Sequence, residues 1–265
     1  MRRVQLFEFG DLQWCPKSLR DAETDYLRFM LELTNAYALI VDRLAMAIDK
    51  CKAYEVVDLC AGGGGPWRRM LPELQRRLPS SVRVRLTDLY PNVAALECMK
   101  EDVGNSLDYE HRSVDATNVT LPGFRTLFTG FHHFPPQLAK RILANAVRER
   151  QGIGIFEFTE RSAFGLAGML LAPLLIMLTV PFIRPFSWPR LFWTYLIPAL
   201  PALGLWDGIV SCLRTYTPGE LRVMTETFSD YEWEIGVQRV RHNPTRICYL
   251  IGVPTEQRLS GYPLG

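Results

Sequence analysis

Short apolar runs separated by stretches with helical spacing organise the middle of the chain, from residue 54 to residue 160. The runs are rich in β-branched and aromatic side chains, which is typical of strands. Because strands and helices alternate, the pattern predicts βαβ units and a parallel sheet in an α/β fold. The expected strands are residues 54–58, 82–88, 111–114, 124–131 and 153–158, and the expected helices between them are residues 66–78 and 136–150.

The N-terminal region has a helical pattern. Apolar residues recur at helical spacing from Thr24 to Lys50, so residues 1–50 are expected to form an N-terminal helical segment. The sheet-containing domain is then expected to cover residues 51–254, followed by a C-terminal tail at residues 255–265.

The end of the expected domain reads as a hairpin. After an expected helix at Pro218–Phe228, residues 231–241 and 246–253 have the composition of two strands, and Asn243-Pro244-Thr245 separates them. Asn and Pro favour turns, so the pattern predicts two antiparallel strands that close the sheet.

Residues 164–206 interrupt the alternation because they are almost free of charge. Phe164–Ile183 and Leu191–Trp206 contain no charged residue, and Arg184 and Arg190 lie between these two arms. At ~1.5 Å per helical residue, the first arm is long enough to cross a hydrocarbon layer of ~30 Å, and the second is short. Prolines interrupt both arms, which weakens the case for a continuous spanning helix.

Three interpretations of this apolar insertion remain open. A hairpin that dips into the membrane and snorkels its arginines is favoured over a hairpin that crosses it twice. A double crossing would carry Arg184 and Arg190 to the far side, against the positive-inside tendency. The third interpretation is a soluble lid or dimer interface that closes over an apolar substrate. We therefore expect membrane contact through residues 164–206, and the third interpretation allows an oligomer.

The composition is that of an ordinary globular enzyme. The 265 residues are 48% apolar with a formal net charge of +2, and no run of five basic residues occurs, so a nucleic acid partner is not expected. The six cysteines form no Cys-x-x-Cys pair, which argues against a zinc site. The first residues lack an apolar stretch long enough for a signal peptide. We therefore expect a cytoplasmic, membrane-associated protein with free thiols.

The most informative stretch follows the first expected strand. Val56 and Val57 lead into Asp58, and four glycines, Gly62 to Gly65, precede an amphipathic helix. Glycines at such a turn let a ligand lie against the backbone. Dinucleotide sites use the spacing Gly-x-Gly-x-x-Gly with no acid before it. An acid before the glycines suits a ligand that carries a positive amino group.

Two further acids follow expected strands. Asp88 ends the run at residues 82–88, where an acid in nucleotide-binding α/β folds accepts hydrogen bonds from a ribose diol. Asp115 follows the expected third strand. Asp58, Asp88 and Asp115 are therefore expected along one edge of the sheet. Acids are also common in turns and helix caps, but three in register with a glycine turn favour a ligand site.

The acid–glycine turn, Asp88 and the Asp115–Ala116 pair together resemble the motifs of the class I S-adenosylmethionine (SAM)-dependent methyltransferases, in a bacterial branch with an apolar insertion. The resemblance implies SAM as cofactor and a Rossmann-like seven-stranded sheet with an antiparallel terminal hairpin. It also implies that Asp115 and Ala116 contact the adenine amino group. Cys60 departs from the glycine that is usual in the family. The cofactor-binding residues implied are Asp58, Cys60, Ala61, Gly62, Gly63, Gly64, Asp88, Leu89, Asp115 and Ala116.

Candidate catalytic residues follow the fourth and fifth expected strands. His132 and His133 come directly after the fourth, where the resemblance places the transferred methyl group near its acceptor. Histidine can take a proton near neutral pH. Glu157 ends the fifth strand and is expected to face the same site. The alternatives are a structural histidine pair and a carboxylate that is simply solvated at a strand end.

The polar residues that follow the insertion are Asp207, Ser211, Arg214 and Tyr216, which either line the acceptor pocket or serve the structure. The sequence as a whole predicts SAM-dependent methyl transfer to a small-molecule or lipid-like acceptor. Positioning and exclusion of water would supply most of the catalysis, because SAM is already activated. The alternative is a non-catalytic, membrane-associated SAM-binding or scaffold protein. An oxidoreductase of related fold is disfavoured by the glycine spacing and the terminal hairpin.

Overall fold

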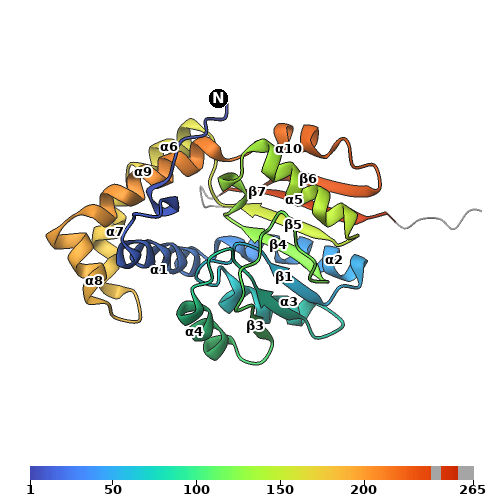
Figure 1. Cartoon of the computed structure of the whole chain (residues 1–265), viewed down its shortest axis with the longest axis horizontal. Helices are drawn as coiled ribbons and strands as arrows, with labels where there is room; N and C mark the ends of the chain where they lie inside the picture. Colours follow the sequence, from blue (N-terminus) through green and yellow to red (C-terminus); the bar gives the residue numbers. More distant parts are fainter. Residues whose placement is uncertain (240–245, 256–265) are drawn as a thin grey trace, which may run out of the picture.

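A seven-stranded sheet in the order β3-β2-β1-β4-β5-β7-β6 forms the centre of the computed structural model, which describes residues 1–239 and 246–255 (Figure 1). β1 to β5 are parallel, β7 is antiparallel to β5, and β6 is antiparallel to β7. The expected α/β sheet with its closing hairpin is confirmed; the expected turn at residues 243–245 lies outside the described residues. The strands are β1 (Glu55–Asp58), β2 (Arg83–Leu86), β3 (Leu107–Tyr109), β4 (Phe124–Phe128), β5 (Ile153–Glu157), β6 (Tyr231–Arg239) and β7 (Arg246–Pro254).

Helices cover both faces of the sheet because its central strands are apolar on both faces. In β1, Val56 packs into the core on one side and Val57 into the core on the other, as period-two alternation requires. The first core is closed by α2, α3 and α4, and the second by α5 and α10. These helices are α2 (Val41–Cys51), α3 (Trp67–Arg77), α4 (Val93–Val103), α5 (Pro136–Arg148) and α10 (Pro218–Thr225).

The N-terminal segment is not one helix over residues 24–50, as the periodicity predicted. It forms α1 (Lys17–Thr34), a 3₁₀ turn at Ala36–Ile40, and then α2. Asn35 ends α1 in the left-handed conformation, with φ of 44°. Asparagine adopts this conformation more readily than most residues, so it breaks the helix although the apolar periodicity continues across it.

The third strand also differs from the prediction. β3 lies at Leu107–Tyr109 and pairs with β2, whereas residues 111–114 belong to the loop that follows. Within that loop the backbone N–H of Val114 donates to the carbonyl oxygen of Asp88 at 2.9 Å. This bond brings the loop back beside the end of β2, so Asp115 still lies on the expected side of the sheet.

The apolar insertion folds into several short helices instead of two continuous arms. No single helix in the described part of the chain is long and apolar enough to cross a membrane; two helix pairs with bends of 41° and 83° satisfy length and composition together. The helices that make up and leave the insertion are α6 (Ala163–Met169), α7 (Ala172–Thr179), α8 (Trp188–Leu191) and α9 (Ala199–Arg214), with a 3₁₀ turn at Val180–Phe182 and a π-helical turn at Phe192–Leu196.

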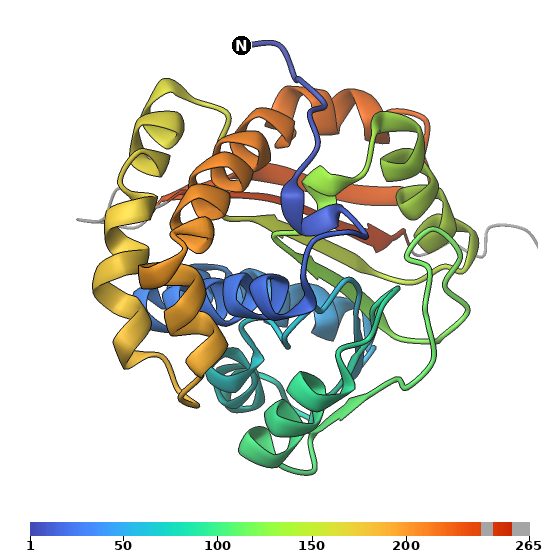
Figure 2. The same cartoon turned by 60° about the vertical axis from the view of Figure 1, so that its left-hand side comes forward.

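The inner face of the insertion packs on α1 (Figure 2). Leu19 and Tyr26 of α1 share a buried cluster with Ile176 and Leu200 of the insertion. Arg190 is buried and its Nη1 donates to Asp25 Oδ2 of α1 at 2.5 Å. The expectation that Arg190 snorkels into a membrane is therefore wrong.

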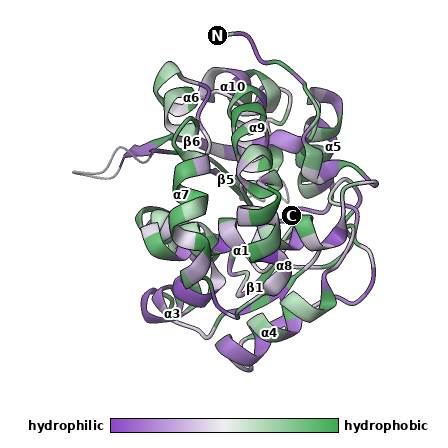
Figure 3. Ribbon diagram, turned by 90° about the vertical axis from the view of Figure 1, so that its left-hand side faces the viewer, coloured by the Kyte–Doolittle hydropathy of each residue, from purple (hydrophilic) through white to green (hydrophobic). Residues whose placement is uncertain are grey.

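The outer face of the insertion exposes apolar side chains. Figure 3 shows by colour that α7 and α9 are rich in hydrophobic residues. Among the described residues, 15 of the 28 exposed large hydrophobic side chains lie within residues 164–206. Phe182 and Trp188 are 70% and 74% exposed, and the exposed Arg184 lies between them in the sequence. We call the exposed hydrophobic side chains of residues 164–206 the outer apolar face. It contains no acidic residue, since none occurs between Glu160 and Asp207.

Candidate active site

Asp58 ends β1 as a fully buried carboxyl group. Its Oδ1 accepts a hydrogen bond from Thr126 Oγ1 at 2.6 Å, and its Oδ2 accepts one from the indole N–H of Trp67 at 2.9 Å. Both oxygens thus tie β1 to β4 and to the start of α3, so Asp58 shapes the glycine turn from behind. Burial raises the pKa of Asp58 to about 7, against the effect of the two hydrogen bonds.

This raised pKa predicts a specific pH dependence of stability. The folded chain keeps the Asp58 proton up to about pH 7, whereas an unfolded aspartate releases it near pH ~4. The Asp58 contribution to the free energy of unfolding is therefore complete below pH ~4 and is lost as the pH rises to about 7. Urea unfolding of wild type and Asp58→Asn between pH 4 and pH 7 measures this contribution. The free energy of unfolding of the variant should change less with pH than that of wild type. Parallel profiles would refute the assignment.

The glycine turn is joined to the second acid. The backbone N–H of Gly62 donates to Asp88 Oδ2 at 3.0 Å, and the N–H of Tyr90 donates to Asp88 Oδ1 at 2.8 Å. Gly62 has φ of +52°, and a Cβ built there would meet no atom within 4 Å. Open space therefore lies on the Gly62 side of the turn, next to the Asp88 carboxylate.

The other glycines of the turn face protein. A Cβ on Gly63 would lie 2.8 Å from Thr24 Cγ2 of α1, and one on Gly64 would lie 2.7 Å from Met99 Cε of α4. Gly64 also has φ of +102°, which disfavours any side chain there. Packing explains the glycines at these two positions, while the glycine at Gly62 keeps a space free.

The remaining predicted cofactor residues surround this turn. Ala61 donates its N–H to the carbonyl of Thr87 at 2.9 Å, and Cys60 has a left-handed φ of 57°. Leu89 is exposed beside Asp88, and Ala116 is buried.

Asp115 is exposed, and its Oδ1 accepts hydrogen bonds at 2.8 Å from the N–H and the hydroxyl of Thr117. The structure thus gathers Gly62, Asp88 and Asp115 on one edge and places Asp58 beneath them.

His132 is oriented by Glu157. Glu157 Oε1 accepts the backbone N–H groups of Phe131 at 2.7 Å and His132 at 3.1 Å, and Oε2 lies 2.7 Å from His132 Nδ1. A carboxylate is an acceptor, so Nδ1 carries the hydrogen and Nε2 carries the lone pair. Nε2 is buried and has no hydrogen-bond partner among the described residues. Glu157 therefore positions His132, since its carboxylate is buried and both oxygens face the histidine turn.

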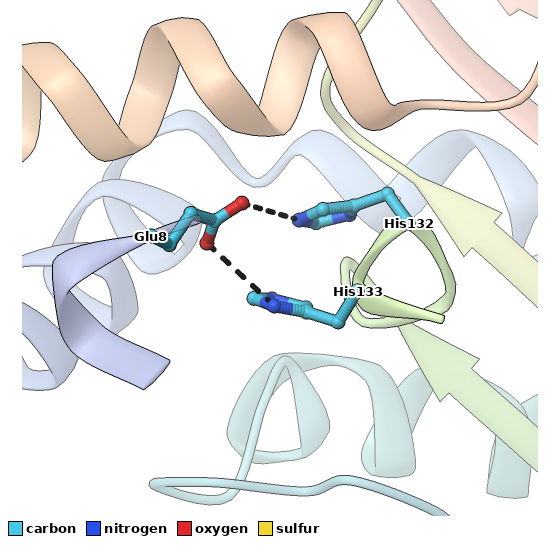
Figure 4. A group of neighbouring side chains, drawn as sticks. All are labelled: Glu8, His132 and His133. Carbon is cyan, nitrogen blue, oxygen red and sulfur yellow. Dashed lines mark ion pairs between the residues drawn. The ribbon is translucent and has the colours of Figure 1, made fainter. Parts of the chain in front are cut away.

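His133 faces acids from the N-terminus. Its Nδ1 lies 3.2 Å from Asp11 Oδ1. Glu8 lies between the two histidines, with Oε2 3.6 Å from His133 Nδ1 and Oε1 3.8 Å from His132 Nε2 (Figure 4). Burial lowers the pKa of His133, but the hydrogen bond to Asp11 and the charges of Glu8 and Asp11 outweigh it and raise the pKa to about 9. Arg214 Nη1 lies 3.0 Å from Glu8 Oε1 and from Asp11 Oδ2.

Residues 1–12, here called the N-terminal strap, run across the ends of β4 and β5 beside α9 (Figure 2). Arg3 Nη2 donates to the carbonyl oxygen of His132 at 3.0 Å. The backbone N–H groups of Phe9 and Gly10 donate to the two oxygens of Asp207 at 2.8 and 2.9 Å. The strap thereby carries Glu8 and Asp11 to the histidine pair.

The polar residues after the insertion are occupied by the N-terminal strap and its surroundings. Asp207 accepts hydrogen bonds from the backbone of the strap. The hydroxyl of Ser211 donates to Glu8 Oε1 at 3.0 Å, and Arg214 Nε donates to the carbonyl of Leu6 at 2.6 Å. The hydroxyl of Tyr216 donates to the carbonyl of Phe134 at 2.7 Å. Of the two roles left open by the sequence, these contacts favour the structural one.

Sequence reasoning missed Glu8 and Asp11 as site residues. They lie more than 120 positions from the histidines, and an acid in an N-terminal loop has no periodic or motif signal. The available hint was the segment Phe7-Glu8-Phe9, in which an acid lies between two aromatic residues.

Comparison with solved structures identifies the fold. The chain superposes with a TM-score of 0.53 and 12% identity on the CMeT domain of the citrinin polyketide synthase, covering 94% of this chain and 60% of that one. It superposes with a TM-score of 0.51 on an O-methyltransferase family protein from Burkholderia thailandensis, at 15% identity, covering 94% and 62%.

A third match is the O-methyltransferase NcsB1 from neocarzinostatin biosynthesis, with a TM-score of 0.51 and 14% identity, covering 90% of this chain and 59% of that one. NcsB1 was solved in complex with SAM and 2-hydroxy-5-methyl naphthoic acid. This chain spans about 60% of the length of these matched chains. No protein-family model and no curated protein matches the sequence. The chain thus has the class I methyltransferase fold.

Proposed function

We propose that the protein is a SAM-dependent methyltransferase that acts on a small-molecule or lipid-like acceptor. The observation that carries the proposal is the open turn at Gly62, whose N–H binds Asp88 at the end of β2. Asp88 would bind the ribose diol of SAM and Asp115 with Ala116 the adenine, while the methionine part would lie along Cys60 to Gly64. The fold, and the SAM complex of NcsB1, support this assignment.

The histidine pair lies at the acceptor side of this cofactor site. His132, held by Glu157, and His133 would position the nucleophilic atom of the acceptor in line with the sulfonium methyl group. The methyl carbon then forms a bond to that atom as its bond to sulfur breaks, and the electron pair stays on sulfur to give S-adenosylhomocysteine. Most of the rate enhancement would come from this alignment and from exclusion of water.

We further propose that the outer apolar face rests on a membrane and gives access to a lipid-like acceptor. Exposed apolar patches larger than a few hundred Å² normally mark a partner surface. Tryptophan and arginine at positions 188 and 184 suit the interface between hydrocarbon and anionic headgroups. The short, bent helices favour in-plane contact with one leaflet over a crossing.

The cofactor site is tested by Asp88→Ala. A hydrogen bond to a charged group contributes about 1.5–3 kcal/mol, so SAM affinity should fall roughly 10- to 100-fold. Isothermal titration calorimetry of the variant with SAM measures this change. Asp108→Ala removes an exposed acid of β3 that pairs with Lys100, and it should bind SAM like wild type. Unchanged SAM affinity in Asp88→Ala would show that Asp88 does not bind the ribose.

A further inference from the structure

Three potential metal-ligating atoms converge where the N-terminal strap meets the end of β4 (Figure 4). One potential ligand atom from each of Glu8, His132 and His133 lies within 4.8 Å of the other two. The ring nitrogens that face Glu8 are His132 Nε2 and His133 Nδ1. Ligands bound to one ion at ~2.1 Å are ~3.0–3.4 Å apart. The two nitrogens face different oxygens of Glu8, with His132 Nε2 3.8 Å from Oε1 and His133 Nδ1 3.6 Å from Oε2, so the three side chains would draw together around an ion.

His132 Nε2 is a buried nitrogen that lacks a hydrogen-bond donor in the described part of the chain. His132 is 1% exposed, and its Nε2 has no hydrogen-bond partner among the described residues. Because Glu157 accepts the hydrogen on Nδ1, the Nε2 lone pair points toward Glu8, another acceptor. Two acceptors that face each other in a buried place call for a cation between them.

The groups around the three atoms are those that support metal ligands. A metal-bound histidine typically donates its other ring N–H to a carboxylate, as His132 does to Glu157. A ligating carboxylate is itself held by hydrogen bonds, as Glu8 is by Ser211 and Arg214.

The charges of the cluster favour a divalent ion. Glu8, Asp11 and Glu157 supply three negative charges around the two imidazoles, and Arg214 supplies one positive charge. The raised pKa of His133 adds a second positive charge at neutral pH. A divalent cation that replaces the proton on His133 Nδ1 would bring the sum of these charges to zero and release that proton. Arg214 Nη1 lies 3.4 Å from His133 Nδ1, so it would move off that nitrogen while keeping its contacts with the carboxylates.

We propose that Glu8, His132 and His133 bind a divalent metal ion such as Zn²⁺, with open coordination positions for the acceptor. Two histidines and one glutamate form a ligand set used in catalytic zinc sites. The absence of paired cysteines, which argued against zinc from the sequence, does not bear on this nitrogen and oxygen site.

The site would deepen the proposed function, on which this step rests. An acceptor hydroxyl bound to the metal would have a lowered pKa and would release its proton to water. The resulting oxygen anion would attack the methyl carbon of SAM, and the carbon–sulfur bond would break to leave S-adenosylhomocysteine. The metal would thus fix the acceptor atom at the histidine pair.

Titration of the full chain with ZnCl₂ by isothermal titration calorimetry, without SAM, tests the site independently of methyl transfer. Wild type should bind one Zn²⁺, and Glu8→Gln and His133→Gln should each bind at least ~10-fold more weakly. Glu8→Gln keeps an oxygen that can accept from Ser211 and Arg214, and thermal unfolding checks that it folds. If Glu8→Gln does not fold, the Zn²⁺ affinity of His133→Gln tests the site, because the His133 side chain is only half-buried.

His111→Gln, which alters an exposed histidine away from the site, is the matched control and should bind Zn²⁺ like wild type. Absence of Zn²⁺ binding to wild type would overturn the proposal. Equal affinity in wild type, Glu8→Gln and His133→Gln would overturn it as well, because the ion would then bind elsewhere on the chain. Either result would leave the SAM titrations unaffected, so the two proposals fail separately.

Discussion

Replacing Gly62 with valine is expected to abolish SAM binding while the chain still folds. A side chain at Gly62 meets no protein atom within 4 Å, so it would project into the open space beside Asp88. That space is where the proposed cofactor approaches the backbone, and a branched side chain would exclude it. Calorimetry with SAM should show no binding, while circular dichroism shows the wild-type fold.

Gly104→Val provides a matched control. Gly104 also has a positive φ, +88°, and a Cβ there also meets nothing within 4 Å, but it lies at the end of α4 away from the turn. Gly104 has ψ of −162°, a backbone conformation essentially confined to glycine, so valine costs about 1–3 kcal/mol or more there and Gly104→Val also controls for backbone strain. Gly104→Val should bind SAM normally. Normal binding by Gly62→Val would place the cofactor elsewhere.

Removing three aromatic side chains from the outer apolar face should release the chain from lipid. Phe182, Phe186 and Trp188 are all more than half exposed, so their replacement by serine leaves the core intact. Full burial of such side chains is worth ~1.5–3 kcal/mol each, and the combined loss should weaken vesicle binding by at least ~100-fold. Co-sedimentation with vesicles of phosphatidylcholine and phosphatidylglycerol measures the change.

The control for this triple variant is Val223→Ser with Val237→Ser, which removes exposed apolar side chains from α10 and β6. It should sediment with vesicles like wild type. Arg184→Glu should weaken binding to the anionic vesicles and leave binding to pure phosphatidylcholine unchanged. A wild-type chain that stays in the supernatant and forms dimers would contradict the membrane proposal and favour an interface between copies.

Local patterns were sufficient to predict the sheet. Val56 and Val57 followed by Asp58 and the glycines mark a buried strand and a tight turn, and each feature depends only on neighbouring residues. The seven-stranded sheet with its antiparallel hairpin was confirmed for the same reason, whereas α4 between β2 and β3 was not predicted. β3, with three residues, is too short to give a periodic signal, and its place was predicted wrongly.

The parts that were not predicted depend on long-range contacts. Glu8 reaches the histidines because Asp207 and Arg214, about 200 residues away, hold the N-terminal strap. Arg190 looked like a membrane-facing charge, but Asp25 of α1 binds it in the interior. Sequence spacing carries no information on such pairs, so the sequence singled out the histidine pair and Glu157 but not the N-terminal acids that meet them.

The central claim is methyl transfer from SAM. The most direct measurement mixes the purified chain with SAM labelled in its transferable methyl group and a total membrane lipid extract, and then follows label and S-adenosylhomocysteine. We expect label in an organic-soluble product, S-adenosylhomocysteine in equal amount, and neither with Gly62→Val. Stoichiometric SAM binding by wild type, without labelled product from lipid or small-molecule extracts, would contradict the claim and favour a non-catalytic SAM-binding protein.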